Sequence, residues 1–409
     1  MTPPAWYSQS DYKALKKESC MNQYKEIHLI DFPKNTTIML DDHFRKNFIH
    51  NFIDSFNSWK DAIEYLNTKS TKYCITSKVG VGVLSHWFYG IEKVSGKTRR
   101  IPLWAIIEIS ARNDQPLKEV ENNIIDCCVT GRGTPVKINF PIYLTPELVS
   151  IAFHLYGDGY LGGKGKQSHY RQVNKRGLNN FAQKLKNCFG TFEIKISEKS
   201  KIAIPKVLSV FLDEYLELGD CHWNKSRISI KIKSMSNDFL LAGLNAFIVD
   251  EGHIGETIEI YSGNKNLLKD IKEITNKLKY LNCNISEKQE KTGKMYRVRI
   301  SLKNAQKFLN DCKKLETKFS TCGLAHKEHL LKEIVERQNR KWKRRAYGIT
   351  QEMILDLLSN QNLNSLEFRN KLQICGSTLR EHLAKLEAQS KIQKIRPEKS
   401  CCLIWSKVE

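Results

Sequence analysis

Two apolar segments that each end in an acidic residue and a glycine constrain this chain's fold most. They are IAFHLYGDG, residues 151–159, and LNAFIVDEG, residues 244–252. Before the first segment, Thr145-Pro146-Glu147 is a favourable helix start, because it supplies a polar cap, a proline and an acid in the first turn. The sequence therefore predicts two apolar helices, one ending at Asp158 and the other at Glu251.

The order of elements after each acid also repeats. A strand-like stretch is followed by an Asn-Lys pair, at 174–175 and at 264–265, and the pair opens an amphipathic helix. Residues 192–212 then parallel residues 283–309. One such half could not bury both faces of its sheet alone, so we expect the two halves to pack together as a pseudo-dimer in an α+β fold.

Position by position, the two nine-residue segments resemble the motif of the LAGLIDADG homing endonucleases, and the resemblance spans roughly residues 145–330. It implies a monomer with internal pseudo-dimer symmetry and a core of αββαββα type. In that fold the two motif helices pack side by side and antiparallel sheets lie on DNA. The acid in the eighth motif position carries the chemistry of the family. The resemblance thus makes Asp158 and Glu251 the catalytic residues.

The segments depart from the motif at several positions. The sixth position, usually acidic, is Tyr156 or Val249, and the small seventh residue, kept as Gly157, becomes Asp250 in the second segment. Bulky residues also replace small or apolar helix-packing residues at Phe153 and His154. These departures weigh against tight packing of the helices more than against a metal site, because both eighth-position carboxylates and both following glycines remain.

Two carboxylates at neighbouring helix ends repel each other unless a cation lies between them, which predicts a metal site. Oxygen ligands suit Mg²⁺ or Mn²⁺, and magnesium keeps several waters. Asp158 and Glu251 would therefore suffice as ligands, with backbone carbonyls near Gly157 and Asp250. Bridging divalent ions can supply what phosphodiester hydrolysis needs. Alternatively, these are ordinary helix-end acids, although a carboxylate there faces the negative end of the helix dipole.

Two basic segments of the middle region alternate with apolar residues, which predicts strands with one basic face on DNA. They are residues 226–234 and 295–303. A solvated sheet face is the alternative, but such a face usually mixes charges of both signs. The DNA-contacting residues predicted in this region are Arg171, Arg227, Lys231, Lys233, Arg297, Arg299 and Lys303.

The charge of the chain also favours a polyanionic partner. Lys and Arg total 66 against 44 Asp and Glu, a net charge of +22, for which double-stranded DNA is the expected partner and a solvated basic surface the alternative. Neither a signal segment nor a run of 18 apolar residues occurs, and 12 cysteines lack regular spacing. We therefore expect a cytoplasmic protein without membrane association. Cys322, His326 and His329 are too loosely placed to predict zinc.

The N-terminal region, residues 1–140, contains a segment at 58–112 that resembles a phage-repressor-like helix-turn-helix. A small helical domain without DNA contact is the alternative. The residues that carry the resemblance are Ser85, Trp87, Gly90, Ile101 and Pro102. Basic residues between the helices suit phosphate contacts, namely Lys93, Lys97, Arg99 and Arg100.

After an endonuclease-like domain at 141–335 and a basic linker at 336–346, residues 347–409 predict a winged helix of three helices and a hairpin. Its third helix would present Ser377, Thr378, Arg380 and Lys385 to DNA, and its wing would carry Arg396 and Lys399. Winged helices also serve protein contacts, which is the alternative here.

Together these features predict a site-specific, magnesium-dependent endonuclease of double-stranded DNA. A non-cleaving transcriptional regulator on a domesticated LAGLIDADG scaffold is the main alternative, because flanking DNA-binding modules suit either function. The retention of both acids argues for the endonuclease. An intron maturase that acts on RNA is a third possibility, which a basic surface alone does not distinguish.

Overall fold

The computed structural model describes residues 23–90, 100–129, 134–162, 166–219, 225–290, 293–303, 305–339, 348–395 and 404–408. The chain forms two compact units, Met1–Lys332 and Glu333–Glu409. Helices and antiparallel sheets make both, so the predicted α+β class is confirmed. In the described part of the chain, no helix is long and apolar enough to cross a membrane. Several predicted contacts lie outside the described residues: Lys93, Lys97, Arg99, Arg396, Lys399 and most of the linker.

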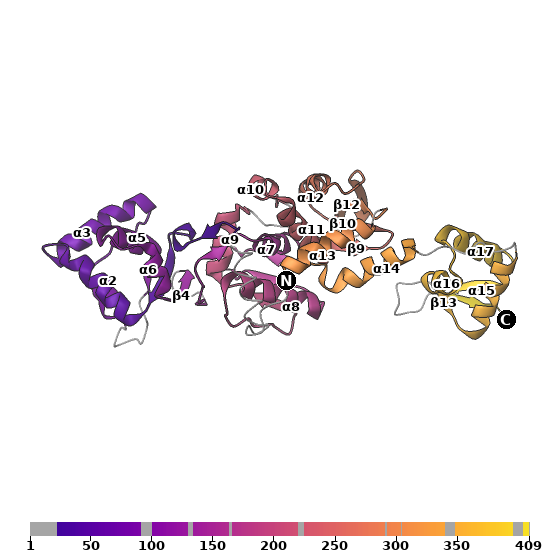
Figure 1. Cartoon of the computed structure of the whole chain (residues 1–409), viewed down its shortest axis with the longest axis horizontal. Coiled ribbons are helices and arrows are strands. Elements are labelled where there is room, and N and C mark those ends of the chain that lie inside the picture. The colour runs from indigo at the N-terminus through magenta and orange to yellow at the C-terminus, as the bar shows by residue number, and fades with distance from the viewer. Residues whose placement is uncertain are drawn as a thin grey trace, which may run out of the picture. The chain divides into compact units, whose positions relative to one another are not determined.

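Short helices and a three-stranded sheet form the N-terminal part of the first unit (Figure 1). The helices are α2 (Asp42–Asp54), α3 (Trp59–Ser70), α4 (Val81–Tyr89), α5 (Leu103–Arg112) and α6 (Leu117–Asn122). The sheet has the order β3-β2-β4, from Ile101–Pro102, Thr36–Leu40 and Ile124–Val129. Helices α3, α4 and α5 lie in the segment at 58–112 that resembles a helix-turn-helix, whereas the sequence pattern predicted neither the sheet nor α2. A short pairing of β1 (Glu26–Ile27) with β5 (Ile142–Tyr143) leads into the next part.

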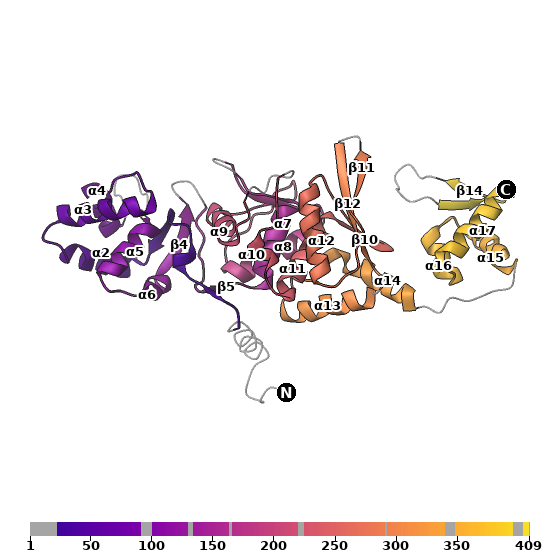
Figure 2. The ribbon, with the colours of Figure 1, turned by 90° about the horizontal axis from the view of Figure 1, so that it is seen from above.

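Two buried helices, α7 (Pro146–Tyr156) and α11 (Asn237–Glu251), lie side by side at the centre of the first unit (Figures 1 and 2). Every residue of α7 is buried. The bulky Phe153 does not loosen this contact, because Gly243 lies opposite it; a Cβ added to Gly243 would lie 2.3 Å from the Phe153 ring. The expectation that the departures from the motif weaken helix packing is therefore wrong, since a large residue on one helix meets glycine on the other.

The elements after α7 and α11 follow the repeat in the sequence. The first half continues with β6 (Gly159–Tyr160), β7 (His169–Arg171), α8 (Lys175–Phe189), β8 (Lys201–Ala203) and α9 (Lys206–Leu216). The second continues with β9 (Gly252–Ile254), β10 (Thr257–Ser262), α12 (Lys265–Lys277), β11 (Ser286–Glu290), β12 (Gly293–Ser301) and α13 (Ala305–Lys318). Their antiparallel sheets have the orders β6-β7-β8 and β11-β12-β10-β9.

Asparagine caps start the amphipathic helix of each half. The Asn174 side chain accepts hydrogen bonds from two backbone amides of α8, and Asn264 does the same for α12. These bonds satisfy amides that have no partner within the helix. The Asn-Lys pair in the sequence therefore predicted both helix starts correctly. The short helices α10 (Ile230–Lys233) and η3 (Ala325–Lys327) also belong to this region, and α14 (Glu328–Asn339) contains the boundary between the two units.

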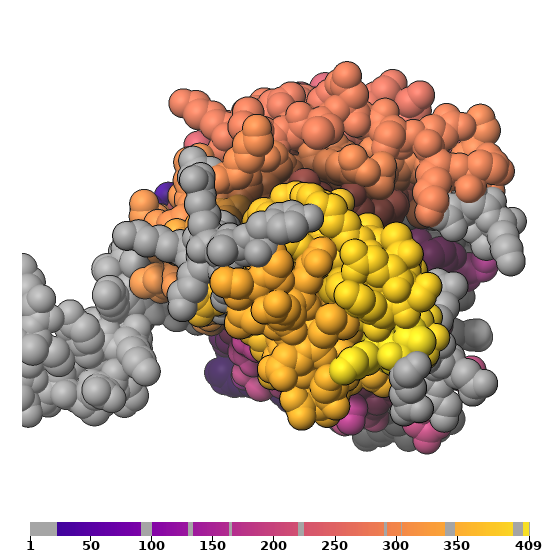
Figure 3. Space-filling model, turned by 90° about the vertical axis from the view of Figure 1, so that its right-hand side faces the viewer, coloured from indigo at the N-terminus to yellow at the C-terminus, as the bar shows by residue number. Residues whose placement is uncertain are grey.

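In the second unit, three helices pack against a small sheet, and Figure 3 shows its surface as one rounded body. The elements are α15 (Ile349–Asn360), β13 (Leu363–Asn364), α16 (Ser365–Leu372), α17 (Gly376–Ala388), β14 (Ile392–Ile395) and β15 (Ile404–Lys407), with the sheet order β13-β15-β14. Buried residues from all three helices and the sheet, among them Ile354, Phe368, Leu383 and Trp405, form its core. The expected three helices and hairpin are present.

The contact between Phe153 and Gly243 gives a direct test of the central packing. We expect Gly243→Ala to lower the free energy of unfolding by about 1–3 kcal/mol, because the added methyl group would overlap the buried Phe153 ring. Phe153→Leu in the same chain should recover part of that loss, which chemical denaturation of the two single variants and the double variant measures as coupling.

Gly82→Ala is the matched control, because no atom lies within 4 Å of a Cβ at that position of α4. It should stabilise the fold by about 0.5–1 kcal/mol through helix propensity alone. Equal effects at Gly243 and Gly82 would show that the helices do not pack as described.

Candidate active site

The C-terminal ends of α7 and α11 bring three carboxyl groups into one place. Helix α7 ends at Tyr156 with Gly157 as its cap, so Asp158 lies just beyond the helix and not at its last residue as predicted. Helix α11 extends through Glu251, as predicted. Asp250 is the third acid, and burial together with the charge of Asp250 raises the pKa of Asp158 to about 7. The two predicted acids therefore stand in different local structures but share one environment.

Glu251 has the same electrostatic character as Asp158. Burial, followed by the charges of Asp158 and Asp250, raises the pKa of Glu251 to about 7. Arg171 and Lys327 act in the opposite direction on Asp158, because their positive charges favour the ionised carboxylate. Perturbed carboxyl groups of this kind are characteristic of functional sites. The structure thus places Arg171, predicted only as a DNA contact, close enough to influence the acids.

The position of Lys327 could not be predicted from the sequence. Its Nζ donates to the backbone oxygens of Ile248 at 2.9 Å and Gly252 at 2.6 Å, at the last turn of α11. Burial lowers the pKa of Lys327, while Asp250, Asp158 and Glu251 oppose that change. The only sequence signal nearby was the loose set of Cys322, His326 and His329, which does not form a metal-ligating group in the described residues.

Asp250 differs most from its predicted role as a backbone ligand. Its side chain is fully buried, and the structure places the carboxylate against Gly157 of the opposite helix, where an added Cβ would lie 2.9 Å from the Asp250 Cβ. Tyr170 donates to Asp250 Oδ1 at 2.7 Å, and His154 Nδ1 lies 2.9 Å from Oδ2. Asp250 is therefore held by protein groups, whereas Asp158 receives a side-chain bond from Gln172 at 3.1 Å.

The oxygen donors of the site suit magnesium. Asp158 and Glu251 supply carboxylate oxygens that are partly buried and repel each other, a charge distribution that a divalent cation would stabilise. Within the described residues, no group of three His, Cys, Asp or Glu side chains could hold a metal ion by itself. The two carboxylates fit an ion that keeps most of its ligands as water or phosphate. The backbone carbonyls of Gly157 and Asp250 remain a prediction.

The strand predicted over residues 295–303 is confirmed as β12, but its open face is not uniformly basic. Arg297 and Arg299 lie opposite Tyr261 and Glu259 of β10. Glu259 Oε1 accepts from Arg299 Nε at 2.8 Å and lies 3.5 Å from Arg297 Nη1. The second half therefore carries an arginine pair organised around one acid. Lys303 lies beyond the end of β12, and Arg171 is exposed at the end of β7.

The strand predicted over residues 226–234 is wrong. Its second part is helix α10, where Ile230 is 81% exposed, while Ile228 and Ile232 are buried. In a strand all three isoleucines would lie on one face, whereas here Ile230 is exposed because the chain turns into a helix after Ser229.

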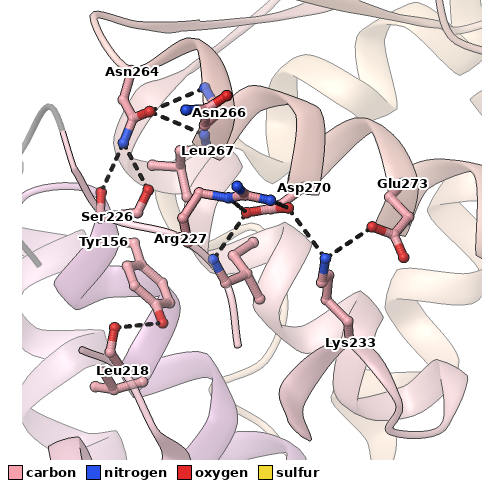
Figure 4. A network of polar contacts seen from close by, with 11 residues as sticks. Tyr156, Leu218, Ser226, Arg227, Lys233, Asn264, Asn266, Leu267, Asp270 and Glu273 are labelled. Carbon is pink, nitrogen blue, oxygen red and sulfur yellow. Dashed lines mark hydrogen bonds and ion pairs between the residues drawn. The ribbon is translucent and has the colours of Figure 1, made fainter. Parts of the chain in front are cut away.

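The cations of that segment bind within the protein (Figure 4). Arg227 makes two bonds to Asp270, at 2.7 and 2.8 Å, and Lys233 bonds both Asp270 and Glu273. Lys231 donates to the Tyr215 backbone oxygen. These bonds fasten α10 and its preceding loop to α12 and α9. The proposed basic face in this segment is thus replaced by internal ion pairs.

The flanking modules place the remaining predicted contacts as follows. Ser377 and Thr378 lie in the first turn of α17, which Cys375 caps, while Arg380 Nε donates to the Gly376 backbone oxygen at 3.2 Å and Lys385 pairs with Glu381. In the N-terminal region, Arg100 makes two bonds to Asp126 of β4, at 2.7 and 3.1 Å, so its cation is paired within the protein.

No protein-family model matches the chain, and no curated protein matches it. Among solved structures, a study of mesophilic variants of the homing endonuclease I-DmoI is similar over 41% of this chain and 94% of that chain, with 18% identity and a TM-score of 0.30. The structure of I-DmoI in complex with DNA and Mn is similar over 41% of this chain and 95% of that chain, with 20% identity and a TM-score of 0.31. Full-length DUF199/WhiA from Thermatoga maritima is similar over 60% of this chain and 92% of that chain, with 12% identity and a TM-score of 0.29.

The raised carboxyl pKa values make the site a source of instability that depends on pH. A carboxyl group with a higher pKa in the folded chain than in the unfolded chain destabilises the fold; this effect is absent below the unfolded pKa of about 4 and complete above about 7. Asp158→Asn should therefore raise the Tm by roughly 2–5 °C at pH 8 and by less at pH 5.

Thermal denaturation without divalent metal at both pH values measures this difference. Asp54→Asn, which removes an exposed carboxylate on α2, is the control and should show no comparable gain at pH 8. A Tm increase of the same size at both pH values would contradict the assigned electrostatics.

Proposed function

We propose that this chain is a site-specific endonuclease of LAGLIDADG type that hydrolyses double-stranded DNA with a divalent metal, Mg²⁺ or Mn²⁺. The observation that carries the proposal is the meeting of Asp158 and Glu251, from two repeats of the sequence, in one desolvated place at the ends of paired helices. Asp158 accepts one hydrogen bond from Gln172 and Lys327 lies near both acids, but burial and the neighbouring carboxylates still raise the pKa of each to about 7. A cation held between them removes that electrostatic cost.

Each half would contribute one acid and one sheet to the reaction. The bound metal would polarise the scissile phosphate and activate water. Asp158 and Glu251 would hold it, and Gln172 would fix the orientation of the Asp158 carboxylate through its 3.1 Å bond. Lys327, anchored on two backbone oxygens of the α11 C-terminus, would keep a positive charge beside the acids and the approaching phosphate.

Arg171, Arg297 and Arg299 are the residues of the two sheets that we propose to contact DNA. Arg171 is exposed at the end of β7, and Arg297 and Arg299 lie on the open face of β12. Arginine can bind phosphate or bind guanine with two hydrogen bonds. The first turn of α17, with Ser377, Thr378 and Arg380, would extend recognition through the winged helix, as the net charge of +22 also favours.

A second candidate function is a DNA-binding regulator that does not cut. The position of Lys327 favours it, because an ammonium group beside three carboxylates supplies an internal counter-charge without a metal. In that case the acids would be relics, and the protein would bind a preferred sequence without breaking it.

The test is cleavage of a randomised duplex library by the purified full chain, with cut ends mapped by sequencing. With Mg²⁺ we expect recurrent cuts at one site, and with Asp158→Asn or Glu251→Gln we expect a loss of cleavage of about 10³-fold or more, because each variant removes a carboxylate that holds the metal. DNA affinity should stay within about threefold of the wild type, as the substituted groups are not proposed to hold the DNA.

Asp238→Asn is the matched control, because Asp238 lies at the opposite end of α11 from Glu251. It should cut like the wild type. Cleavage by Asp158→Asn at the wild-type rate would disprove the divided site, and enrichment of a bound sequence without cutting in either metal would favour the regulator.

A further inference from the structure

Three polar side chains fill the interior of the first half where the second half has apolar ones. They are His154 on α7, Tyr170 on β7 and Lys184 on α8, each 0–1% exposed. Phe247 corresponds to His154, because both lie at the same distance before the motif acid of their half. Ile260 and Ile274 correspond to Tyr170 and Lys184, as counted from the asparagine cap of each half. All three residues of the second half are 0% exposed. The two halves share one order of elements, so general packing does not explain this difference.

The three side chains form a connected chain that ends on an acid of the second half. Lys184 Nζ lies 2.9 Å from His154 Nε2, and His154 Nδ1 lies 2.9 Å from Asp250 Oδ2. Tyr170 donates to the other carboxylate oxygen of Asp250 at 2.7 Å. Because Asp250 belongs to α11, its carboxylate reaches across the helix contact into the first half. All four side chains lie away from solvent.

One arrangement of protons satisfies the hydrogen bonds of this network. A Lys184 ammonium donates to Nε2, and a histidine with its proton on Nδ1 donates in turn to the Asp250 carboxylate, so one tautomer satisfies both contacts. Burial and the nearby Lys184 lower the pKa of His154 well below its usual value, which keeps the ring neutral. The network therefore joins a buried amine to a buried carboxyl group through a neutral ring, and removing either group leaves the other without its hydrogen-bond partner. Burial lowers the pKa of Lys184 and raises the pKa of Asp250 to about 7.

Asp250 is connected to both acids of the candidate site. It directly precedes Glu251 in α11, and its carboxylate accepts a hydrogen bond from the backbone of Asp158. Gly157, just before Asp158, leaves the space that the Asp250 side chain occupies. A shift of α7 along α11 would break these bonds and move one acid relative to the other.

We propose that Asp250 is a positioning residue, locked by His154, Tyr170 and Lys184, that sets the separation and orientation of Asp158 and Glu251. This inference rests on the proposed endonuclease function and assigns to that site a supporting network present in one half only. The network acts through geometry: it holds the ends of two helices in register so that one metal-binding arrangement is formed in advance of DNA binding.

Tyr170→Phe is the main test, since it removes one hydroxyl and keeps the stacking of this ring on Phe181, with centroids 4.1 Å apart. We expect the single-turnover cleavage rate to fall about tenfold or more and the Mg²⁺ concentration for half-maximal rate to rise. The Kd for DNA should stay within about twofold. Tyr156→Phe is the matched control, because the Tyr156 hydroxyl bonds the Leu218 backbone oxygen and not this network; its cleavage should be unchanged.

Cleavage by Tyr170→Phe at the wild-type rate, or a loss of DNA binding in proportion to the loss of cleavage, would overturn the proposal.

If the wild type itself cuts no DNA, the endonuclease function fails, and the contacts that hold Asp250 are tested separately by thermal denaturation of Lys184→Met, Asp250→Asn and the double variant. The Tm change of the double variant should differ clearly from the sum of the two single changes, because Lys184 and Asp250 are joined through His154. Additive losses would show that Lys184 and Asp250 are not coupled.

Discussion

The contact between α7 and α11 is the interaction on which the rest of the first unit depends. Both helices are apolar over most of their length and buried, so neither could exist exposed to water. Gly243 opposite Phe153 and Gly157 opposite Asp250 allow the close approach. Once the helices pair, their C-terminal ends coincide, and the sheets that follow them are placed on either side of the acids.

This pairing also creates an electrostatic cost at one end of the helices. Asp158, Asp250 and Glu251 are all withdrawn from water, and their mutual repulsion is reduced within the chain by Lys327 and Arg171. Sites that bind or react with charged ligands often keep such unfavourable interactions, because the ligand relieves them. The apolar contact between α7 and α11 must offset the free energy lost at the three acids.

Local signals predicted much of the fold and only part of the site. The two motif helices and the Asn174 and Asn264 caps follow from spacing and capping chemistry, which act within a few residues. The meeting of Asp158 with Glu251 was implied by the resemblance to the LAGLIDADG motif. Residues 226–234 were misjudged because their cations bind Asp270, 43 residues beyond Arg227. The roles of Asp250 and Lys327 depend likewise on partners distant in sequence, which periodicity does not report.

The placement of the buried polar groups has a consequence for the origin of the chain. A dimer of two first halves would set glycine against glycine and leave the Lys184–His154–Tyr170 group without an acid. Two second halves would direct an Asp250 carboxylate into an apolar interior lined by Phe247, Ile260 and Ile274. Neither half can therefore replace the other. If a symmetric ancestor was duplicated to give this chain, its two halves have since become complementary, and neither half could now form the same core by pairing with a copy of itself.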